Sequence, residues 1–404
     1  MRCWLACFVL CGCGGPVDAG SNVPAKEVVP ADSSLADTAV PEGQTVSADS
    51  VHPFAVGTLP NPEHATCLWG TSVAQGDVAL GRGTAIDAIW SFYSRTGAAL
   101  GSAVSNPDPL HGDTLVSAIF PAKSGFQIVS RRFGLAFGGL LIDFATNGTR
   151  LVQTPISGHL DDLLYLQSIP TGGLNAVTFS DLQHAADVRW IDDSAAILDD
   201  DDIFVAVPYD DLRVFAVTDT SSHTLALYPG LGTMRAQWLN ADGSVRVGEF
   251  ALALPANALL SPLIGGGFAV RSGDDWVGTI ASDATSIGAA PAWLAHRPRT
   301  RLVIVEHERR YALLFDDGAT SPTLPQTIEL RRRDGAWAGA LVAWPPAGSF
   351  ASQQTRIGRD GTVVQLLSRA LATGAQCNYR WWPGLLRSGV NGDGTSVCVA
   401  GSCP

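Results

Sequence analysis

The chain has 404 residues and a formal net charge of −12, with 46% hydrophobic and only 16% charged residues. The acidic balance argues against nucleic acid as a partner, because binding to phosphates needs a basic surface. The low charged fraction argues against a wholly disordered chain or a coiled coil. The length allows one large β domain or two to three ordinary domains.

The N-terminus has the pattern of an export signal. Residues 1–13 read MRCWLACFVLCGC, in which one positive charge at Arg2 precedes the short apolar run Cys3–Cys11. A charged start followed by such a run is typical of a secretory signal peptide, and the run is too short to span a bilayer.

The end of this signal carries a more specific motif. Leu10-Cys11-Gly12-Cys13 resembles the lipobox of bacterial lipoproteins, with Leu three positions before the cysteine and a small residue just before it. The resemblance implies that Cys13 carries the lipid and becomes the mature N-terminus, so that acyl chains anchor the protein to a membrane. It also implies a lipoprotein of the bacterial cell envelope, and the non-acidic Gly14 favours the outer membrane. A plain signal peptide with incidental cysteines is the alternative.

Residues 14–64 differ in composition from the rest of the chain. They contain seven acidic residues and one basic residue, many prolines and many small side chains. A segment of this kind does not bury enough apolar surface to offset the entropy lost on ordering. We therefore predict a disordered tether over residues 14–64, followed by a folded domain over residues 65–404 that ends in a short cysteine-containing tail.

From Ala65 onward the sequence is typical of β structure. Short apolar runs such as Phe126–Ser130, Leu302–Val305 and Thr362–Leu367 alternate with Gly, Asp, Asn and Pro. Each run has the length of a strand, and long stretches with helical period are missing from the sequence. The expected fold class is therefore all-β.

Two series of glycines recur at regular spacing. The first series follows Asn or Asp between apolar runs, at steps of 95 and 92 residues: Gly148, Gly243 and Gly335. The second series has steps of 48 and 94 residues: Gly125, Gly173 and Gly267. Both series fit a unit of ~47 residues, close to the length of one β-propeller blade. The spacing predicts a β-propeller of about seven blades, and tandem β-sandwich domains are the alternative.

Four cysteines lie beyond the signal, at Cys67, Cys377, Cys398 and Cys403. An even number in an exported chain indicates disulfides. We predict a Cys67–Cys377 bond that joins the two ends of the ring, with Cys398–Cys403 closing a small loop. A Cys377–Cys398 pair with the other two joined is the alternative. The cysteines lack CxxC spacing, which argues against a metal site.

The sequence carries no GxSxG elbow, Walker loop, dinucleotide fingerprint or HExxH motif. Its densest acidic cluster is Asp199, Asp200, Asp201 and Asp202. Clustered carboxylates suit Ca²⁺, which makes these four residues a weak metal candidate. Consecutive acids on an extended chain cannot all point one way, so a solvated loop between strands is the favoured interpretation. No other cofactor is predicted.

Three further clusters each have a functional and a structural interpretation. Arg331–Arg333 could bind an anionic ligand or mark the end of a strand. Glu306–Arg310 has the residue types of a catalytic site but is typical of a hairpin tip. The aromatic side chains of Tyr379, Trp381 and Trp382 could stack on sugar rings or pack between blades. The structural interpretation is favoured for each.

These features predict a lipid-anchored envelope β-propeller that binds a protein or a glycan without catalysing a reaction. The alternative is a propeller enzyme, a glycoside hydrolase or lyase that acts on extracellular polysaccharide. Such an enzyme would bring carboxylate, His or Arg side chains from separate blades to the central channel. The ligand and the oligomeric state cannot be read from the sequence.

Overall fold

The computed structural model describes residues 44–47, 54–60, 66–72, 77–83, 89–101, 104–105, 114–122, 125–132, 138–155, 161–169, 173–180, 185–192, 197–204, 215–230, 233–255, 257–305, 310–315, 326–343, 352–358, 360–371 and 374–386. Within these residues the strands β1 to β28 form seven sheets. We name each sheet by its consecutive strands, from the β3–β6 sheet to the β26–β28 sheet.

Four of the sheets have four consecutive strands each. Their strands are β3 (Thr66–Ser72), β4 (Val78–Gly83), β5 (Ile89–Tyr93) and β6 (Val104–Ser105); β7 (Thr114–Pro121), β8 (Gly125–Arg132), β9 (Gly138–Ala145) and β10 (Arg150–Pro155); β11 (Asp161–Ser168), β12 (Leu174–Ser180), β13 (Ala185–Ile191) and β14 (Ile197–Phe204); β15 (Phe215–Thr218), β16 (Thr224–Pro229), β17 (Met234–Leu239) and β18 (Val245–Leu252).

The other three sheets depart from this pattern. One has only three strands: β19 (Ala258–Pro262), β20 (Phe268–Ser272) and β21 (Asp275–Ile280). The other two each gain a strand from the N-terminal region: β22 (Thr300–Val305), β23 (Arg310–Phe315), β24 (Gln326–Arg331) and β25 (Trp337–Ala343) with β1 (Gln44–Ser47); β26 (Ser352–Ile357), β27 (Val363–Leu371) and β28 (Gly374–Trp382) with β2 (Phe54–Pro60).

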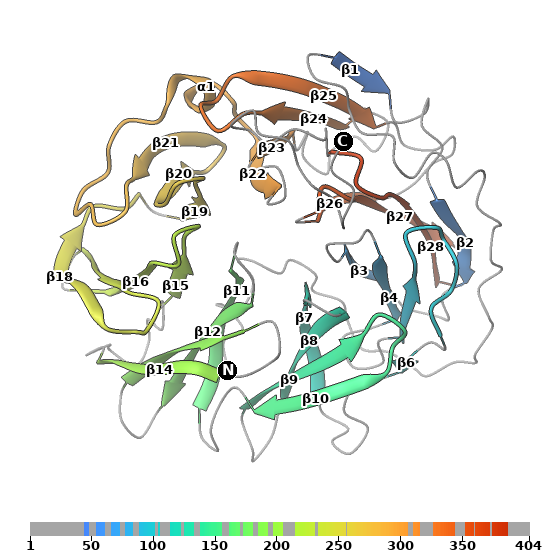
Figure 1. Cartoon of the computed structure of the whole chain (residues 1–404), viewed down its shortest axis with the longest axis horizontal. Coiled ribbons are helices and arrows are strands. Elements are labelled where there is room, and N and C mark those ends of the chain that lie inside the picture. The colour runs from blue at the N-terminus through green and yellow to red at the C-terminus, as the bar shows by residue number, and fades with distance from the viewer. Residues whose placement is uncertain are drawn as a thin grey trace, which may run out of the picture.

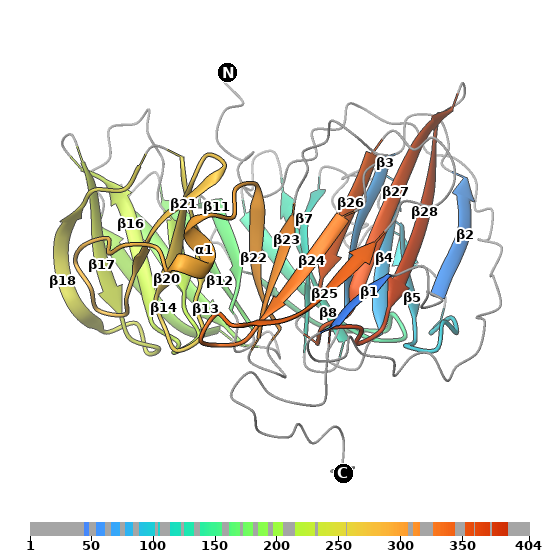
Figure 2. The same ribbon diagram turned by 90° about the horizontal axis from the view of Figure 1, so that it is seen from above.

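The sheets follow one another around a ring in chain order, and the first strand of each consecutive set lies nearest the centre (Figure 1). Figure 2 shows the same ring from the side. This is a β-propeller arrangement, so the predicted all-β fold and its propeller organisation are confirmed. Each sheet contacts a neighbour on both sides, which the alternative of separate sandwich domains does not provide.

The ring closes through the N-terminal region. β2 pairs antiparallel with β28, from Phe54 opposite Trp381 to Pro60 opposite Gln376. β1 pairs in the parallel sense with β25 of the neighbouring sheet. Both strands lie within residues 14–64, so the predicted disordered tether was placed too far along the chain. A segment too polar to build a core can still be ordered, because the edge of an existing sheet supplies its hydrogen-bond partners.

The glycine series mark equivalent turns of different sheets. Gly148, Gly243 and Gly335 each lie in the turn between a third and a fourth strand, with φ of 80°, 77° and 86°. The amide of each donates to the carbonyl three residues earlier, a tight turn that favours glycine at this φ. In the second series Gly125 begins β8, and Gly173 and Gly267 directly precede β12 and β20, each the second strand of its sheet. The spacing in the sequence therefore reports one structural unit.

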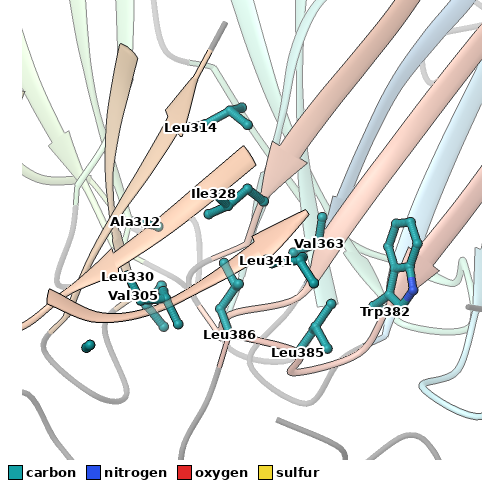
Figure 3. Close-up of a cluster of buried hydrophobic side chains, with 11 residues drawn as sticks. Val305, Ala312, Leu314, Ile328, Leu330, Leu341, Val363, Trp382, Leu385 and Leu386 are labelled. Carbon is teal, nitrogen blue, oxygen red and sulfur yellow. The ribbon is translucent and has the colours of Figure 1, made fainter. Parts of the chain in front are cut away.

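The closing sheet packs on both of its faces. Trp381 and Tyr379 join a cluster with the β3–β6 sheet, whereas Trp382 joins one with the β22–β25 sheet (Figure 3). Side chains alternate between the faces of a strand, so consecutive tryptophans fill opposite sides. Tyr379, Trp381 and Trp382 are only 1%, 1% and 2% exposed. The predicted packing between sheets is confirmed for these aromatic residues, and buried rings do not stack on sugars.

A recurring tryptophan links one sheet to the next. In three sheets the indole Nε1 of a tryptophan on the third strand donates to an oxygen of the following sheet or of the chain directly after it. The pairs are Trp190 to Thr224 Oγ1 (2.9 Å), Trp238 to the Ala284 carbonyl (2.9 Å) and Trp276 to Thr300 Oγ1 (2.8 Å). Each indole thus adds a directional contact to the apolar packing between neighbouring sheets.

The three-stranded β19–β21 sheet is completed by irregular chain. An isolated antiparallel bridge between Thr279 and Gly288 lies where other sheets have a fourth strand. The short helix α1 (Ala292–Ala295) follows it and leads to β22. No helix in the described part of the chain has the length and apolar character needed to cross a membrane.

Candidate functional site

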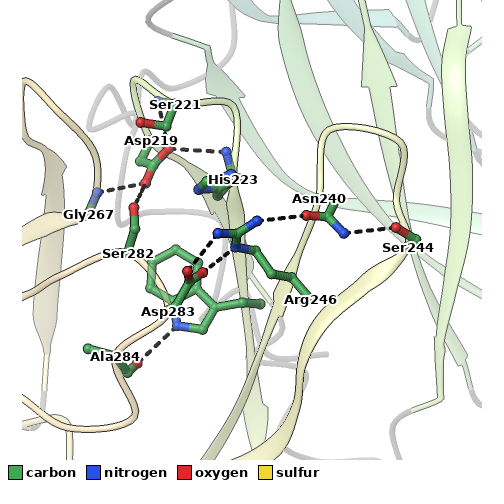
Figure 4. A network of polar contacts seen from close by, with 11 residues as sticks. Asp219, Ser221, His223, Asn240, Ser244, Arg246, Gly267, Ser282, Asp283 and Ala284 are labelled. Atoms are coloured by element: carbon green, nitrogen blue, oxygen red, sulfur yellow. Dashed lines mark hydrogen bonds and ion pairs between the residues drawn. The ribbon is translucent and has the colours of Figure 1, made fainter.

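Two turns from neighbouring sheets meet (Figure 4). The β15–β16 turn runs from Asp219 to His223, and the β19–β20 turn runs from Leu263 to Gly267. Each is closed by a backbone hydrogen bond of 2.9 Å between its first amide and its last carbonyl. Both turns join the first and second strands of their sheets, so they lie near the centre of the ring.

Asp219 joins the two turns. Its carboxylate is fully buried and accepts four hydrogen bonds. Within its own turn, Oδ1 accepts from the amides of Ser221 (2.8 Å) and His223 (3.1 Å). Across the interface, Oδ2 accepts from the Gly267 amide and from Ser282 Oγ, both at 2.6 Å. The carboxylate therefore fixes the shape of one turn and attaches it to the next sheet.

The backbone amides of the β19–β20 turn bind oxygen atoms of the neighbouring turn. Thr220 Oγ1 accepts from the amides of Gly265 and Gly266 at 3.1 Å each and donates to the Leu263 carbonyl at 2.7 Å. With Gly267, three successive amides point at side chains of the neighbouring turn, an arrangement that otherwise binds anions. A Cβ at Gly266, where φ is +102°, would lie 2.5 Å from Ser282 Oγ. Glycine is required here, and the Thr220 and Asp219 side chains of the same chain occupy the site formed by the three amides.

An ion pair makes a second link farther from the centre. Arg246 of β18 pairs with Asp283, and its Nη2 lies 2.7 Å from Asp283 Oδ2. Its Nη1 also donates to Asn240 Oδ1 at 3.2 Å. The hydrogen bond from Arg246 holds the pKa of Asp283 below its ordinary value. The Arg246 and Asp283 side chains are 35% and 39% exposed, so this pair stabilises less than a buried one.

A third polar group lies within the β15–β18 sheet. Glu249 Oε2 accepts from the Tyr228 hydroxyl at 2.7 Å, and Oε1 accepts from Arg235 Nε at 2.9 Å. These two bonds, first that from Tyr228, lower the pKa of Glu249. Burial raises the pKa of the Tyr228 hydroxyl. Glu249 and Asp283 are thus each paired with an arginine.

The geometry supports a structural role for this network. Its carboxylates bind amides, hydroxyls and guanidinium groups of the same chain, and these contacts hold the β15–β18 and β19–β21 sheets together. Among the side chains that the structure describes, no three His, Cys, Asp or Glu residues are arranged to hold a metal ion.

The acidic cluster lies in a strand. Asp199 to Asp202 belong to β14, where Asp199 lies opposite Trp190 and Asp202 opposite Asp187 of β13. The predicted solvated loop is therefore wrong. Aliphatic residues at both ends of the segment and pairing with β13 outweigh the low β propensity of Asp. Their side chains lie outside the described part of the structure, so Ca²⁺ binding stays a prediction.

Arg331 ends β24 and is held internally. Its Nη2 lies 2.8 Å from Glu329 Oε2, and its Nη1 donates to the Gly335 carbonyl at 3.0 Å. It is only 9% exposed. The interpretation of a charged strand end is confirmed for this arginine, which does not offer its guanidinium to an external anion.

The mixed cluster of Glu306–Arg310 links β22 to β23. Val305 lies opposite Arg310 in this antiparallel pair, so residues 306–309 form the hairpin connection. The hairpin is confirmed, and residues 306–309 themselves lie outside the described residues. Arg310 is 1% exposed and begins β23.

The disulfide and lipid predictions stay untested. Cys67 lies in β3 and Cys377 in β28, which are contacting strands of neighbouring sheets. They are not in one sheet, because β2 rather than β3 pairs with β28. Cys13, Cys398 and Cys403 lie outside the described residues.

The sequence interpretation missed the central polar contacts. Asp219 and Thr220 begin a stretch of small polar residues between two apolar runs, a signal that predicts the turn itself. Their contact with Gly265–Gly267, more than 40 residues away, has no local signal. Neither does the Arg246–Asp283 pair.

No protein family matches the chain, and no curated protein matches it. Among solved structures it is similar to a protein of unknown function from Bacteroides caccae, at 11% identity and a TM-score of 0.39 over 70% of this chain and 99% of that one. It is also similar to prolyl oligopeptidase B from Galerina marginata, at 10% identity and a TM-score of 0.48 over 75% of this chain and 46% of that one. For oligopeptidase B from Leishmania major the identity is 12% and the TM-score 0.41, over 75% of this chain and 45% of that one. The chain therefore spans less than half the length of these two peptidases.

Proposed function

We propose that the chain is a lipid-anchored propeller of the bacterial outer membrane that binds an envelope protein or glycan without catalysing a reaction. In this proposal each of the seven sheets is one blade, and Cys13 carries the lipid. The observation that carries it is the way in which the ring is closed. The N-terminal region pairs with two neighbouring sheets before it enters the ring, so a lipid at Cys13 would be joined to the ring through two paired strands.

The polar contacts support a rigid binding surface more than a catalytic site. Asp219, the Arg246–Asp283 pair and Trp238 connect the β15–β18 and β19–β21 sheets. Trp190 and Trp276 each connect a further pair of neighbouring sheets. A ring fixed in this way offers a rigid surface for a partner, because little conformational entropy remains to be lost on binding.

The anchor is tested by replacing Cys13 with Ser in the full chain. We expect the variant to be exported and to leave the membrane fraction, because a serine hydroxyl does not accept the lipid that holds the parent chain. The measurement is the distribution of protein between membrane pellet and supernatant. Replacing Cys11 with Ser is the matched control, and it should stay in the pellet. A Cys13→Ser protein that remains in the membrane would contradict the anchor.

Binding is tested with the soluble Cys13→Ser chain and isolated cell envelopes. We expect saturable co-sedimentation and no new reducing or unsaturated sugar ends in the envelope polysaccharide. Envelopes treated with protease or with polysaccharide-degrading enzymes distinguish a protein ligand from a glycan. New sugar ends would replace this proposal with a hydrolase or a lyase. An absence of saturable binding would contradict the proposed binding function.

A further inference from the structure

Four segments meet in the interface between the β19–β21 and β22–β25 sheets. The Ile264 amide of the β19–β20 turn donates to the hydroxyl oxygen of Tyr311 in β23 at 2.8 Å. The Tyr311 ring stacks on Trp293 of α1, with ring centres 5.0 Å apart. Trp293 in turn lies against Gly335 of the β24–β25 turn, where a Cβ would overlap its indole. The β19–β20 turn, β23, α1 and the β24–β25 turn are therefore joined by successive contacts.

Arg333 completes this circle of contacts. It lies two residues before Gly335 in the β24–β25 turn, and its Nη2 is 2.9 Å from the position that a Cβ at Gly265 would take. The guanidinium therefore lies against the glycine that follows Ile264. Burial raises the pKa of the Tyr311 hydroxyl, whereas the bond from the Ile264 amide and then the charge of Arg333 act to lower it. The Arg333 guanidinium thus lies near the Tyr311 hydroxyl as well.

The Arg333 guanidinium is exposed and available to a ligand. Four other arginines with accessible guanidinium groups each pair with a carboxylate: Arg235 with Glu249, Arg246 with Asp283, Arg297 with Glu329 and Arg299 with Asp274. Arg333 makes no hydrogen bond or ion pair with any residue that the structure describes. An anion can therefore bind to it without displacing an acidic side chain of the protein.

Trp293 carries a second free donor at this interface. Its side chain is partly buried, and its Nε1 is accessible to solvent and has no partner among the described residues. In this it differs from the tryptophans of the third strands, whose Nε1 atoms donate to the chain that follows. One face of the Trp293 indole is fixed by Tyr311. A guanidinium and an indole N–H are thus both unpaired around the same pair of turns.

The charge of this region is opposite to that of the whole chain. Arg297 and residues 329–335 together contain four arginines and two acidic residues, so their net charge is +2. The net charge of the chain is −12. A local positive surface on an acidic protein attracts an anionic ligand to that place and not to the rest of the surface.

We propose that Arg333 and Trp293 bind a carboxylate-bearing sugar of an acidic glycan. The guanidinium donates two parallel hydrogen bonds to the carboxylate, and the indole N–H donates to a hydroxyl of the same sugar. A sugar acid has a carboxylate, hydroxyl groups and an apolar ring face within one residue, which matches a guanidinium beside an indole. This inference rests on the proposed binding function and specifies its site and the chemistry of its ligand.

The test uses the full Cys13→Ser chain with and without Arg333→Ala. The probe is the acidic polysaccharide extracted from isolated envelopes and immobilised, either untreated or with its carboxyl groups reduced to alcohols. We expect Arg333→Ala to weaken binding to the untreated probe at least ~10-fold, because it removes charge-assisted hydrogen bonds. The reduced probe should bind both chains equally weakly. Arg299→Ala is the matched control, since it removes an exposed guanidinium that Asp274 already pairs, and it should keep the parent affinity.

Trp293→Phe tests the second donor. Phe keeps a ring that can stack on Tyr311 and removes only the N–H, so binding should weaken while the midpoint of urea-induced unfolding changes little. Unchanged affinity in this variant would exclude the indole from the site.

Equal affinity of Arg333→Ala and Arg299→Ala for the untreated probe would overturn the inference, as would a parent chain that does not bind this probe. Binding that is lost after protease treatment of the probe would assign the carboxylate to a peptide and overturn the glycan. Envelope co-sedimentation separates this inference from the proposed function. Undiminished capture of envelopes by Arg333→Ala would exclude this site and leave the binding function intact, whereas loss of capture by every chain, the parent included, would contradict the binding function itself.

Discussion

Replacing Asp219 with Ala is expected to destabilise the protein by about 3 kcal/mol or more, because buried donors that lose their acceptor cost ~1–3 kcal/mol each. Four donors lose their acceptor at once: two amides of the same turn, the Gly267 amide and the Ser282 hydroxyl. The Asp219 side chain is fully buried, so Ala leaves a void beside these groups. The measurement is the midpoint of urea-induced unfolding, followed by tryptophan fluorescence.

Asp242→Ala is the matched control. Asp242 lies in another turn of the same sheet and accepts from the Ser244 amide at 3.1 Å and from Ser244 Oγ at 2.6 Å. It is exposed, so water replaces the lost carboxylate, and only a small change is expected. If the two variants unfold at the same urea concentration, the contact between the two turns does not stabilise the ring.

Replacing Trp382 with Ala is expected to cost about 3–5 kcal/mol, as for other fully buried aromatic residues. The indole is 2% exposed and packs between the closing sheet and the β22–β25 sheet, next to Leu385 and Leu386. The Arg380 guanidinium lies 4.9 Å from its ring centre and loses this contact too. Because the cavity lies beside the sheet that closes the ring, limited proteolysis should cut near β2 sooner than in the parent protein.

Trp337→Ala is the comparison for this prediction. This substitution also removes an indole, from the neighbouring β22–β25 sheet, but the Trp337 side chain is 43% exposed. Its unfolding midpoint should therefore change much less. Equal losses in the two variants would mean that the interface at Trp382 contributes no more than a half-exposed contact.

The repeating unit could be predicted from the sequence because its signals are local. A turn that needs positive φ selects glycine wherever it recurs, so Gly148, Gly243 and Gly335 report the same turn in three sheets. The apolar runs between the turns gave the strands for the same reason. Local residue types determine both features.

The ring closure and the polar contacts could not be predicted in this way. The composition around β2 is that of a tether, and the edge of β28 gives this segment hydrogen-bond partners. Asp199–Asp202 resemble a loop by composition and lie in β14 because β13 pairs with them. Asp219 binds Gly267, 48 residues away. In each case the partner is distant along the chain, and its identity depends on how the sheets are placed.

The pairing of β2 with β28 also determines when folding can finish. Phe54 lies opposite Trp381, so the two ends of this pair are separated by 327 residues. During synthesis β2 is made long before its partner strand exists, and the entropy of closing so long a loop must be overcome before any contact of the pair forms. The intermediate sheets can assemble one after another while β2 remains without its partner. Pairing of β2 with β28 is thus expected to be the last step of folding, and chains truncated before β26 should keep both terminal sheets open to association with other molecules.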